Sequence, residues 1–493
     1  MTTGGAHRFS AAILLMAALL LPGLASPALA AAAAGQCGAD PNVQAPPPES
    51  PPGPPGIWHD SEAAIRARRS HWIPALEILG FDFLLNQTDR RLYNGDAYDS
   101  DFSSISDNWH SHWVTDDDPF ATNQLGHPYQ GSIYHELARS AGLGFWESLG
   151  YTFTGSILWE LAGETTAPSR NDQVASGIGG SFLGEPLFRM ASLVLENGRG
   201  RIGFWRHAAA AVIAPPVVAN RWLFGDRFDA IFPSRDPVYY SRLQVGVSGT
   251  TQSQPGPSTK LKRDEALLDF SLDYGLPGKP GYLYRRPFDY FSFQATASSA
   301  NGFENVMTRG LLAGAAYGIG DHQRGVWGLY GSYDYIAPQI FRVSTTALSI
   351  GTTSQWGTAR PMALQATGLL GVGYAAVGTI HGTGDRDYHY GFAPQAALVL
   401  RAIFGGRASL DVTARDYFVT GVVDNRGGRD NIARADLSLT LRLHHKHAIA
   451  AKYLWSRRDA SYSDLVDATQ TRGTVGIFYT RLGHDRFGAV DWR

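Results

Sequence analysis

The chain has 493 residues, a formal net charge of −2 at pH 7 and a single cysteine, Cys37. A chain of this length is expected to form more than one domain. Its near-neutral charge argues against nucleic acid as a partner, because nucleic-acid-binding proteins normally carry a basic excess. A single cysteine excludes an intramolecular disulfide, so the fold must form without one.

Residues 1–30 have the pattern of a cleavable signal peptide. A short start with basic residues precedes an apolar run over 11–21, and residues 28–30 read Ala-Leu-Ala, the small-residue pattern that signal peptidase recognises. The apolar run is shorter than the roughly 20 residues that a membrane-spanning helix needs. We therefore expect export with cleavage after Ala30 rather than a retained anchor.

Residues 31–56 are expected to form a disordered linker. Residues 46–55 read PPPESPPGPP, a stiff and extended composition that cannot build a core. Cys37 lies in this linker and follows Gln36, where a lipid-attachment site would require a small residue. We interpret Cys37 as incidental.

Residues 57–235 are expected to form a helical domain that lies either on the periplasmic side of a membrane or inside a barrel as a plug. Their apolar residues recur at helical spacing, interrupted by glycine and proline. The expected helices span about 128–142, 145–162 and 171–196. In the last of them, Ser176, Gly180 and Gly184 form a stripe of small residues that would let another backbone approach closely.

Residues 236–493 are expected to form an antiparallel transmembrane β-barrel of roughly 12 strands, because their apolar residues recur with a period of two. Over 434–444, for example, leucine and alanine alternate with polar side chains. A soluble β-sandwich alternates in the same way. Many of the segments reach the about 9–11 residues that cross a bilayer at a tilt, which favours the barrel. The expected fold class is therefore α+β, in two domains, located in the outer membrane.

Aromatic and charged residues support the barrel. Four basic residues occupy the alternate strand positions that we assign to the lumen, where they would stay hydrated: Arg401, Arg415, Arg442 and Lys452. Such barrels usually end on an aromatic residue, and here Arg493 follows Trp492. The following aromatic residues gather near expected strand ends, as aromatic girdles require: Tyr282, Tyr284, Phe288, Tyr290, Tyr333, Tyr335, Tyr388, Tyr390, Tyr417 and Phe418.

Several motifs between Asp116 and Arg221 resemble a bacterial envelope family that is catalogued only as a domain of unknown function, serial three-nine-four-three. The residues that carry the resemblance are TNQLGHPYQGS over 122–132, FWES over 145–148, Asn171-Asp172, Gly184-Glu185, Arg189 and Asn220-Arg221. Gln130 departs from the family, in which many members have histidine, and this weakens any metal site at that position. The resemblance implies a helical motif domain joined to a strand-rich tail, and no activity.

His127 is the first candidate for catalysis. It precedes Pro128 at the start of an expected helix, where the helix dipole favours a neutral imidazole that could act as a general base. Asp116 and Asp118 lie just upstream as an acidic partner or a metal site, and Glu160 and Glu164 are further candidates to assist it. The structural alternative is a solvated acidic turn beside a hydrogen-bonding histidine. His135-Glu136 lacks the second histidine of a zinc-peptidase motif, so we expect no metal there.

A polar network is expected among the helices. Its members are Arg139, Glu185, Arg189, Asn171 and Asp172. The arginines are expected to neutralise Glu160 and Glu164, and Glu185 is placed to pair with Arg189 one turn away. Buried ion pairs of this kind fix helix registry more often than they catalyse reactions, so the structural interpretation is favoured.

Two functions therefore stay open. The first is an outer-membrane β-barrel protein with an associated helical domain and a structural, gating or assembly role in the envelope. The second is a membrane-associated enzyme that acts on an envelope lipid or glycolipid with His127 as the general base. The first is favoured because no complete catalytic constellation can be assembled from the motifs. Outer-membrane lipid is the expected partner, and neither a metal nor a cofactor is expected.

Overall fold

The structure is a computed structural model. It describes residues 57–93, 96–196, 202–254, 261–357, 362–380, 384–421, 428–463, 465–484 and 486–492. The predicted signal peptide, the predicted linker and Cys37 lie outside the described residues, as does Arg493. None of the described helices is both long and apolar enough to cross a membrane.

The described residues before 228 are helical. The helices are α2 (Ile57–Arg68), α3 (Trp72–Tyr93), η3 (Asp96–Tyr98), α4 (Phe102–His110), η4 (Thr122–Gly126), α5 (His127–Ser140), α6 (Phe145–Leu158), η5 (Trp159–Gly163), α7 (Arg170–Asp172), η6 (Gln173–Gly179), α8 (Gly180–Glu196), α9 (Phe204–Ile213), α10 (Pro215–Phe224) and η7 (Gly225–Arg227). The expected helices over about 128–142, 145–162 and 171–196 correspond to α5, to α6 with η5, and to α7 with η6 and α8.

The rest of the chain forms one closed antiparallel barrel of 12 strands, each paired with its sequence neighbours and the last paired with the first. The strands are β1 (Tyr239–Gln254), β2 (Asp264–Tyr274), β3 (Phe291–Ser298), β4 (Asn305–Ile319), β5 (Gln323–Ile336), β6 (Arg342–Gly357), β7 (Met362–Gly378), β8 (Tyr388–Phe404), β9 (Ala408–Thr420), β10 (Gly428–His444), β11 (His447–Tyr462) and β12 (Ala468–Leu482). This confirms the predicted fold class and strand number.

The two ends of the barrel differ. At the end where β1 begins and β12 finishes, β4 and β5 are joined by residues 320–322 and β10 and β11 by residues 445–446, although the long loop between β2 and β3, residues 275–290, also lies at this end. We call this the turn end. At the opposite end, which we call the loop end, β7 and β8 are joined by residues 379–387. Short turns at the end that holds the termini of the barrel are typical of outer-membrane barrels, in which that end faces the periplasm.

The period-two pattern separates an apolar exterior from a polar lumen, as predicted. On β10, the outward-facing Leu437, Leu439 and Leu441 are 41–45% exposed, whereas the intervening Ser438 and Thr440 are buried. Three of the predicted lumen charges are ion-paired: Arg401 with Asp411, Arg415 with Asp436, and Lys452 with Asp269 at 3.2 Å. The fourth, Arg442, lies over the ring of Phe487. Charges at these positions are tolerated because the lumen provides carboxylate partners for them.

The lumen is crossed by ion pairs. Arg401 of β8 pairs with Asp273 of β2 at 3.0 Å, although β2 and β8 are opposite each other in the ring of strands. Arg434 of β10 lies 3.8 Å from Glu304, which precedes the opposite strand β4. These contacts draw opposite walls together, so the lumen in the described structure is packed rather than open.

Both mouths of the barrel are also filled. Near the loop end, inward-facing apolar side chains form a cluster that includes Met307, Phe341 and Val419. At the turn end, the segment after β12 folds across the mouth, and Val490 exchanges two backbone hydrogen bonds with the side chain of Gln355, at 2.6 and 3.0 Å. Gln355 belongs to β6, which is opposite β12 in the ring, so the segment spans the mouth.

The predicted small-residue stripe allows α5 and α8 to pack closely. A Cβ atom added at Gly131 would lie 2.1 Å from the carbonyl oxygen of Ser176, and one at Gly180 would lie 2.6 Å from the Cα atom of Gly131. Only residues without a side chain fit at this crossing. The prediction from Ser176, Gly180 and Gly184 is therefore confirmed.

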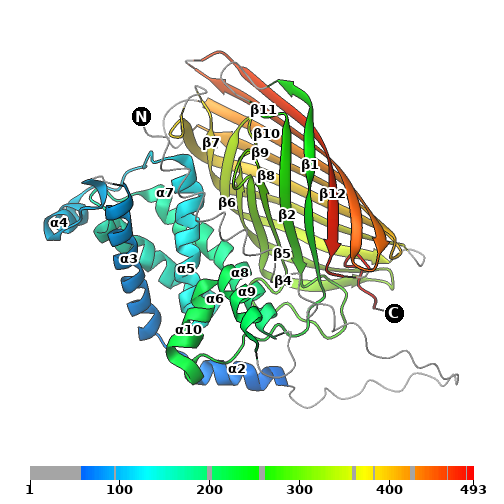
Figure 1. The fold of residues 1–493 in the computed structure, drawn as a ribbon, viewed down its shortest axis with the longest axis horizontal. Coiled ribbons are helices and arrows are strands. Elements are labelled where there is room, and N and C mark those ends of the chain that lie inside the picture. The colour runs from blue at the N-terminus through cyan, green and yellow to red at the C-terminus, as the bar shows by residue number, and fades with distance from the viewer. Residues whose placement is uncertain are drawn as a thin grey trace.

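The helical domain packs against the outside of the barrel and does not plug it (Figure 1). Phe182 of α8 lies over Gly331 of β5, where an added Cβ would be 2.6 Å from the Phe182 ring. In the same way Phe288, from the loop between β2 and β3, covers Gly310 of β4. Both glycines point outward, because their neighbours Arg309 and Ser332 face the lumen. The helical domain thus lies outside the lumen, which the barrel fills with its own side chains.

Candidate functional site

Three π-helical segments, η4, η5 and η6, surround the residues singled out in the motif segment. His127 directly follows η4, Glu160 lies within η5, and Asp172 directly precedes η6. π-Helical turns are rare and occur most often at functional sites. No sequence pattern predicted them, because each widened turn is accommodated inside a continuous helical run.

His127 and Asp172 face each other in the buried centre of this cluster. The distance from His127 Nε2 to Asp172 Oδ1 is 3.8 Å, and both side chains are less than 10% exposed. The Asp172 carboxylate is held by the hydroxyl of Ser169, and its Oδ1 atom accepts a hydrogen bond from Asn171 Nδ2 at 3.1 Å. Ser169 also caps the helix, accepting from the Asp172 backbone N–H at 3.1 Å.

The prediction that the His127 imidazole is neutral is wrong. Burial alone would lower its pKa, but the carboxylates of Asp172, Glu164 and Asp116 outweigh burial, so the pKa of His127 is raised. His127 also does not lie at a free helix N-terminus, because its backbone N–H donates to the carbonyl of Thr122 in η4. The structure therefore favours an imidazolium over a general base.

Glu160 and Glu164 are held by different partners. Glu160 Oε2 accepts from the Ser169 backbone N–H at 2.7 Å, while Glu164 accepts from Trp159 Nε1 at 2.7 Å. Burial, followed by repulsion from Asp172 and Glu164, raises the pKa of Glu160 to about 10. Burial raises the pKa of Glu164 to about 7 and that of Asp172 to about 6, with His127 opposing both shifts. The cluster therefore holds more carboxyl groups than it can ionise together at neutral pH.

The barrel completes this cluster. Tyr390 of β8 accepts hydrogen bonds at 2.9 Å from both Asn171 Nδ2 and Gln124 Nε2. The Asp116 backbone N–H donates to Asn171 Oδ1 at 2.8 Å, and Asp118 pairs with Arg386, beside β8, at 3.1 Å. The acidic run thus joins the helical domain to the loop end of the barrel. Tyr390 was predicted only as a girdle residue, because nothing in the sequence places it beside Asn171.

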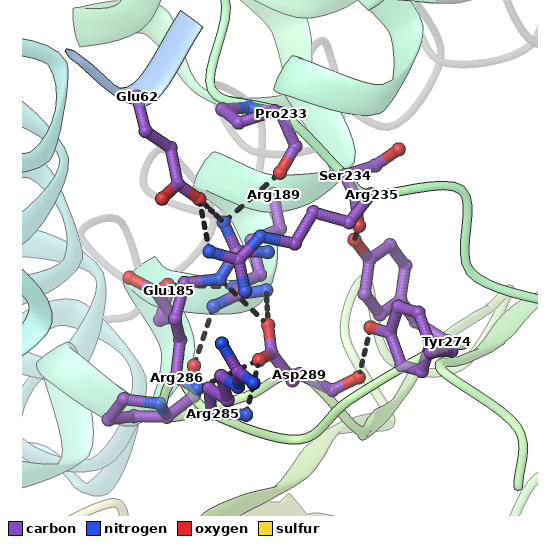
Figure 2. A network of polar contacts seen from close by, with 12 residues as sticks. Glu62, Glu185, Arg189, Pro233, Ser234, Arg235, Tyr274, Arg285, Arg286 and Asp289 are labelled. Carbon is purple, nitrogen blue, oxygen red and sulfur yellow. Dashed lines mark hydrogen bonds and ion pairs between the residues drawn. The ribbon is translucent and has the colours of Figure 1, made fainter. Parts of the chain in front are cut away.

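The predicted arginines lie in a second, separate cluster. Arg139 Nε and Arg189 Nε both donate to the buried carboxylate of Glu185, at 2.7 and 2.8 Å. Arg189 Nη1 also reaches Asp289, in the loop between β2 and β3, at 3.0 Å. Figure 2 shows Asp289 among the arginines of both parts of the chain.

The expected pairing of Arg139 and Arg189 with Glu160 and Glu164 is therefore wrong. The two clusters lie at opposite ends of α5, which runs from His127 to Ser140 and so separates them by about 18 Å at 1.5 Å per residue. Helical spacing gave the correct local pair, Glu185 with Arg189, but it could not show which end of the neighbouring helix each carboxylate meets.

The remaining motif residues are buried and polar. His135 Nε2 lies 3.1 Å from Glu185 Oε2, and Gln130 donates to Tyr134 at 2.6 Å. Burial raises the pKa of Glu136 well above its usual range. Within the described parts of the chain, no three His, Cys, Asp or Glu side chains are arranged to hold a metal ion.

One family model matches part of the chain. Residues 112–216 match the family model described as Domain of unknown function (DUF3943), which confirms the predicted resemblance. No curated protein matches the chain.

Solved structures similar to this chain include the NanC porin, the KdgM porin and the translocator domain of the autotransporter NalP from Neisseria meningitidis. Their sequence identities are 7%, 8% and 16%, and their TM-scores are 0.26, 0.23 and 0.23. The matches cover 48%, 48% and 55% of this chain and 98%, 98% and 99% of the three structures. The barrel is defined by its own strand pairing, and such distant likenesses carry no argument about its role.

Proposed function

We propose that this chain is an outer-membrane protein whose barrel is a closed anchor for the helical domain rather than a diffusion channel. The role is structural: the barrel holds the helical domain at the membrane. The observation that carries the proposal is the ion pair between Arg401 and Asp273, which joins opposite strands across the lumen.

The exterior of the barrel supports a membrane location. Outward-facing apolar side chains are exposed around the ring, including Val247 of β1, Ile350 of β6, Leu370 of β7 and Ile477 of β12, each 65–71% exposed. A continuous apolar exterior around a polar, ion-paired interior is what a bilayer requires of a spanning barrel. In water the same surface would be an aggregation hazard.

The wall beneath the helical domain supports a permanent attachment. Its outward positions include small residues, such as Thr308, Gly310 and Gly331, where the lipid-facing part of β10 carries leucine. Phe182 of the helical domain fills the space above Gly331, and Phe288, from the barrel's own loop, covers Gly310 and contacts the rings of Phe145 and Phe182. Burying a phenylalanine stabilises a contact by about 1.5–3 kcal/mol, so the burial of Phe182 alone opposes detachment of the domain.

The test is conductance of the purified full-length chain in planar bilayers. We expect no stepwise conductance from the wild-type protein. The double variant Arg401→Ser, Asp273→Ser should conduct more than wild type, because it removes the bridge across the lumen. A matched variant of an exposed ion pair, Arg457→Ser, Asp459→Ser, should stay silent. Stable wild-type channels would refute the closed-anchor proposal, and mature protein that is soluble without detergent would refute the membrane location.

The alternative is an enzyme acting on an envelope lipid or glycolipid, with His127 as base. Its support is the cluster of carboxyl groups with raised pKa values around His127. Against it, His127 is only 6% exposed and its pKa is raised. In cells that lack the wild-type gene, a folded and abundant His127→Ala protein should still complement. Loss of complementation at normal protein levels would favour the enzyme instead.

A further inference from the structure

A cavity of about 520 Å³ lies where the helical domain meets the turn end of the barrel. Its walls come from α2, α5, α8 and α10, from the start of α6 and residues 142–144 before it, from residues 227–232 and from the loop between β2 and β3. The volume falls within the range of roughly 300–1,000 Å³ that is typical of small-molecule sites. Trp146 lines the cavity and is 58% exposed, so the cavity communicates with the surface.

The cavity is strongly cationic. Eight arginines and three glutamates line it: Arg66, Arg69, Arg139, Arg189, Arg221, Arg227, Arg285 and Arg286, with Glu62, Glu147 and Glu185. The buried Glu185 is shared by Arg139 and Arg189, and the partly buried Glu62 is shared by Arg286 and Arg235. Asp289 pairs with Arg189 and Arg286 as well, yet the arginines that line the cavity still outnumber the carboxylates around it.

Some N–H groups of these arginines have no hydrogen-bond acceptor among the described residues. Arg286 Nη2 and Arg221 Nε are buried without a hydrogen-bond acceptor among the described residues. Arg66 and Arg285 also line the cavity; both residues are exposed, and neither forms an ion pair with a described carboxylate. A buried donor without an acceptor costs free energy that a bound anion would recover. Arginine forks match the two oxygens of a phosphate better than lysine would, and all eight cations here are arginine.

The remaining lining is apolar. It consists of Ile65, Leu143, Phe145, Trp146, Phe188, Leu195, Val217, Phe228, Ile231 and Phe232 among others. Phe232 marks the boundary between the two halves, because the guanidinium groups of Arg139, Arg189 and Arg286 lie 4.5–5.1 Å from its ring centre. A free phosphate ion would leave this apolar half unused, whereas an amphiphile would fill both halves.

We propose that this cavity binds an anionic phospholipid, with the phosphate against the arginines and one acyl chain along the aromatic side. The ligand class rests on the proposed outer-membrane location, which places the turn end at the inner leaflet, where phospholipid is the surrounding material. Trp205 and Trp222, on α9 and α10, are each 69% exposed. Exposed tryptophan is typical of segments at the lipid headgroup level. The helical domain is thus a phospholipid-binding module attached beside a closed barrel.

Native mass spectrometry and titration of the full-length chain in a phosphate-free detergent test this proposal. The probes are short-chain phosphatidylglycerol, uncharged diacylglycerol and inorganic phosphate. The variant Arg66→Gln, Arg285→Gln removes two guanidinium groups without breaking a described ion pair, and Ala230→Trp fills the cavity without changing charge. Arg91→Gln, on the exposed end of α3, is the matched charge control.

We expect one tightly held phosphatidylglycerol per wild-type chain and at least tenfold weaker binding by the double variant and by Ala230→Trp, since each lost charge-assisted contact is worth roughly tenfold or more. Arg91→Gln should bind like wild type. Equal lipid binding by all variants would mean nonspecific annular lipid and would overturn the proposal. Phosphate binding as tight as that of the lipid, or no binding of either, would also overturn it. Because binding is measured in detergent, a conducting wild-type barrel would refute the closed anchor and leave this result unaffected.

Discussion

Glu185 is the residue whose removal should most disturb the helical domain. Its carboxylate is fully buried and accepts hydrogen bonds from Arg139 at 2.7 Å and from Arg189 at 2.8 Å. In Glu185→Gln the two guanidinium groups would face each other with Asp289 as their remaining buried counter-charge. Breaking a buried ion pair in this way typically costs about 3–5 kcal/mol.

A double-mutant cycle with Arg139→Met isolates the interaction. Each single variant leaves one buried charge unbalanced, whereas the double variant leaves Arg189 paired with Asp289. The double variant should therefore be more stable than the sum of the single effects predicts, by about 1–3 kcal/mol. The assay is urea unfolding of the helical domain, followed by limited proteolysis in detergent while the barrel stays folded.

The pH dependence gives an independent check on Glu185. Burial opposes ionisation of this group, but Arg139 and Arg189 lower its pKa well below the usual range. A lowered carboxyl pKa stabilises the folded state above the unfolded value of about 4.5, and the contribution is lost as pH falls through the folded pKa. The difference between wild type and Glu185→Gln should therefore shrink below about pH 4.5. Additive single effects, or a difference that does not change with pH, would refute the assignment of a charged, shared carboxylate.

Three further predictions follow from the packing. Glu160→Gln should stabilise the helical domain by up to about 3 kcal/mol at pH 7. The pKa of Glu160 is raised from 4.5 to about 10, so this carboxyl group destabilises the folded state increasingly as pH rises above 4.5. Backbone hydrogen exchange should be slower in the variant than in wild type at pH 7 but not at pH 4, and equal rates at pH 7 would contradict the prediction. Leu439→Arg, on the lipid face, should cost about 2–4 kcal/mol in barrel refolding experiments, while Arg457→Leu on the exposed rim should cost much less. Gly131→Val should separate α5 from α8 and make α8 sensitive to protease, whereas Gly150→Val, which has open space around it, should not.

Much of the barrel could be predicted from the sequence because every strand must present apolar side chains to lipid and polar side chains to the lumen. Alternation over 434–444 fixes which side chains face outward, and with it the inward position of Lys452 on the next strand. The sequence could not show that the lumen is closed. Closure depends on pairs such as Arg401 and Asp273, which are far apart along the chain and meet only because a ring of 12 strands places β8 opposite β2.

The sequence identified the residues of the candidate site but not how their side chains are arranged. His127, Glu160, Glu164 and Asp172 do lie in one cluster, because the motif segment supplies them all. Their charge states could not be predicted, since three widened helical turns bury several carboxyl groups together and reverse the expected effect on His127. The cationic cavity was missed because its arginines are contributed by segments spread from residue 66 to residue 286.

The segment that crosses the turn end also bears on the order of assembly. Val490 bonds to Gln355 of β6 from the segment that follows β12, the strand that closes the ring against β1. Within the same segment, the Trp492 indole N–H donates to the carbonyl of Asp321, in the turn between β4 and β5, at 3.1 Å. Because these contacts join the segment after the last strand to the β4–β5 turn and to β6, they can form only after β4, β5 and β6 are in place.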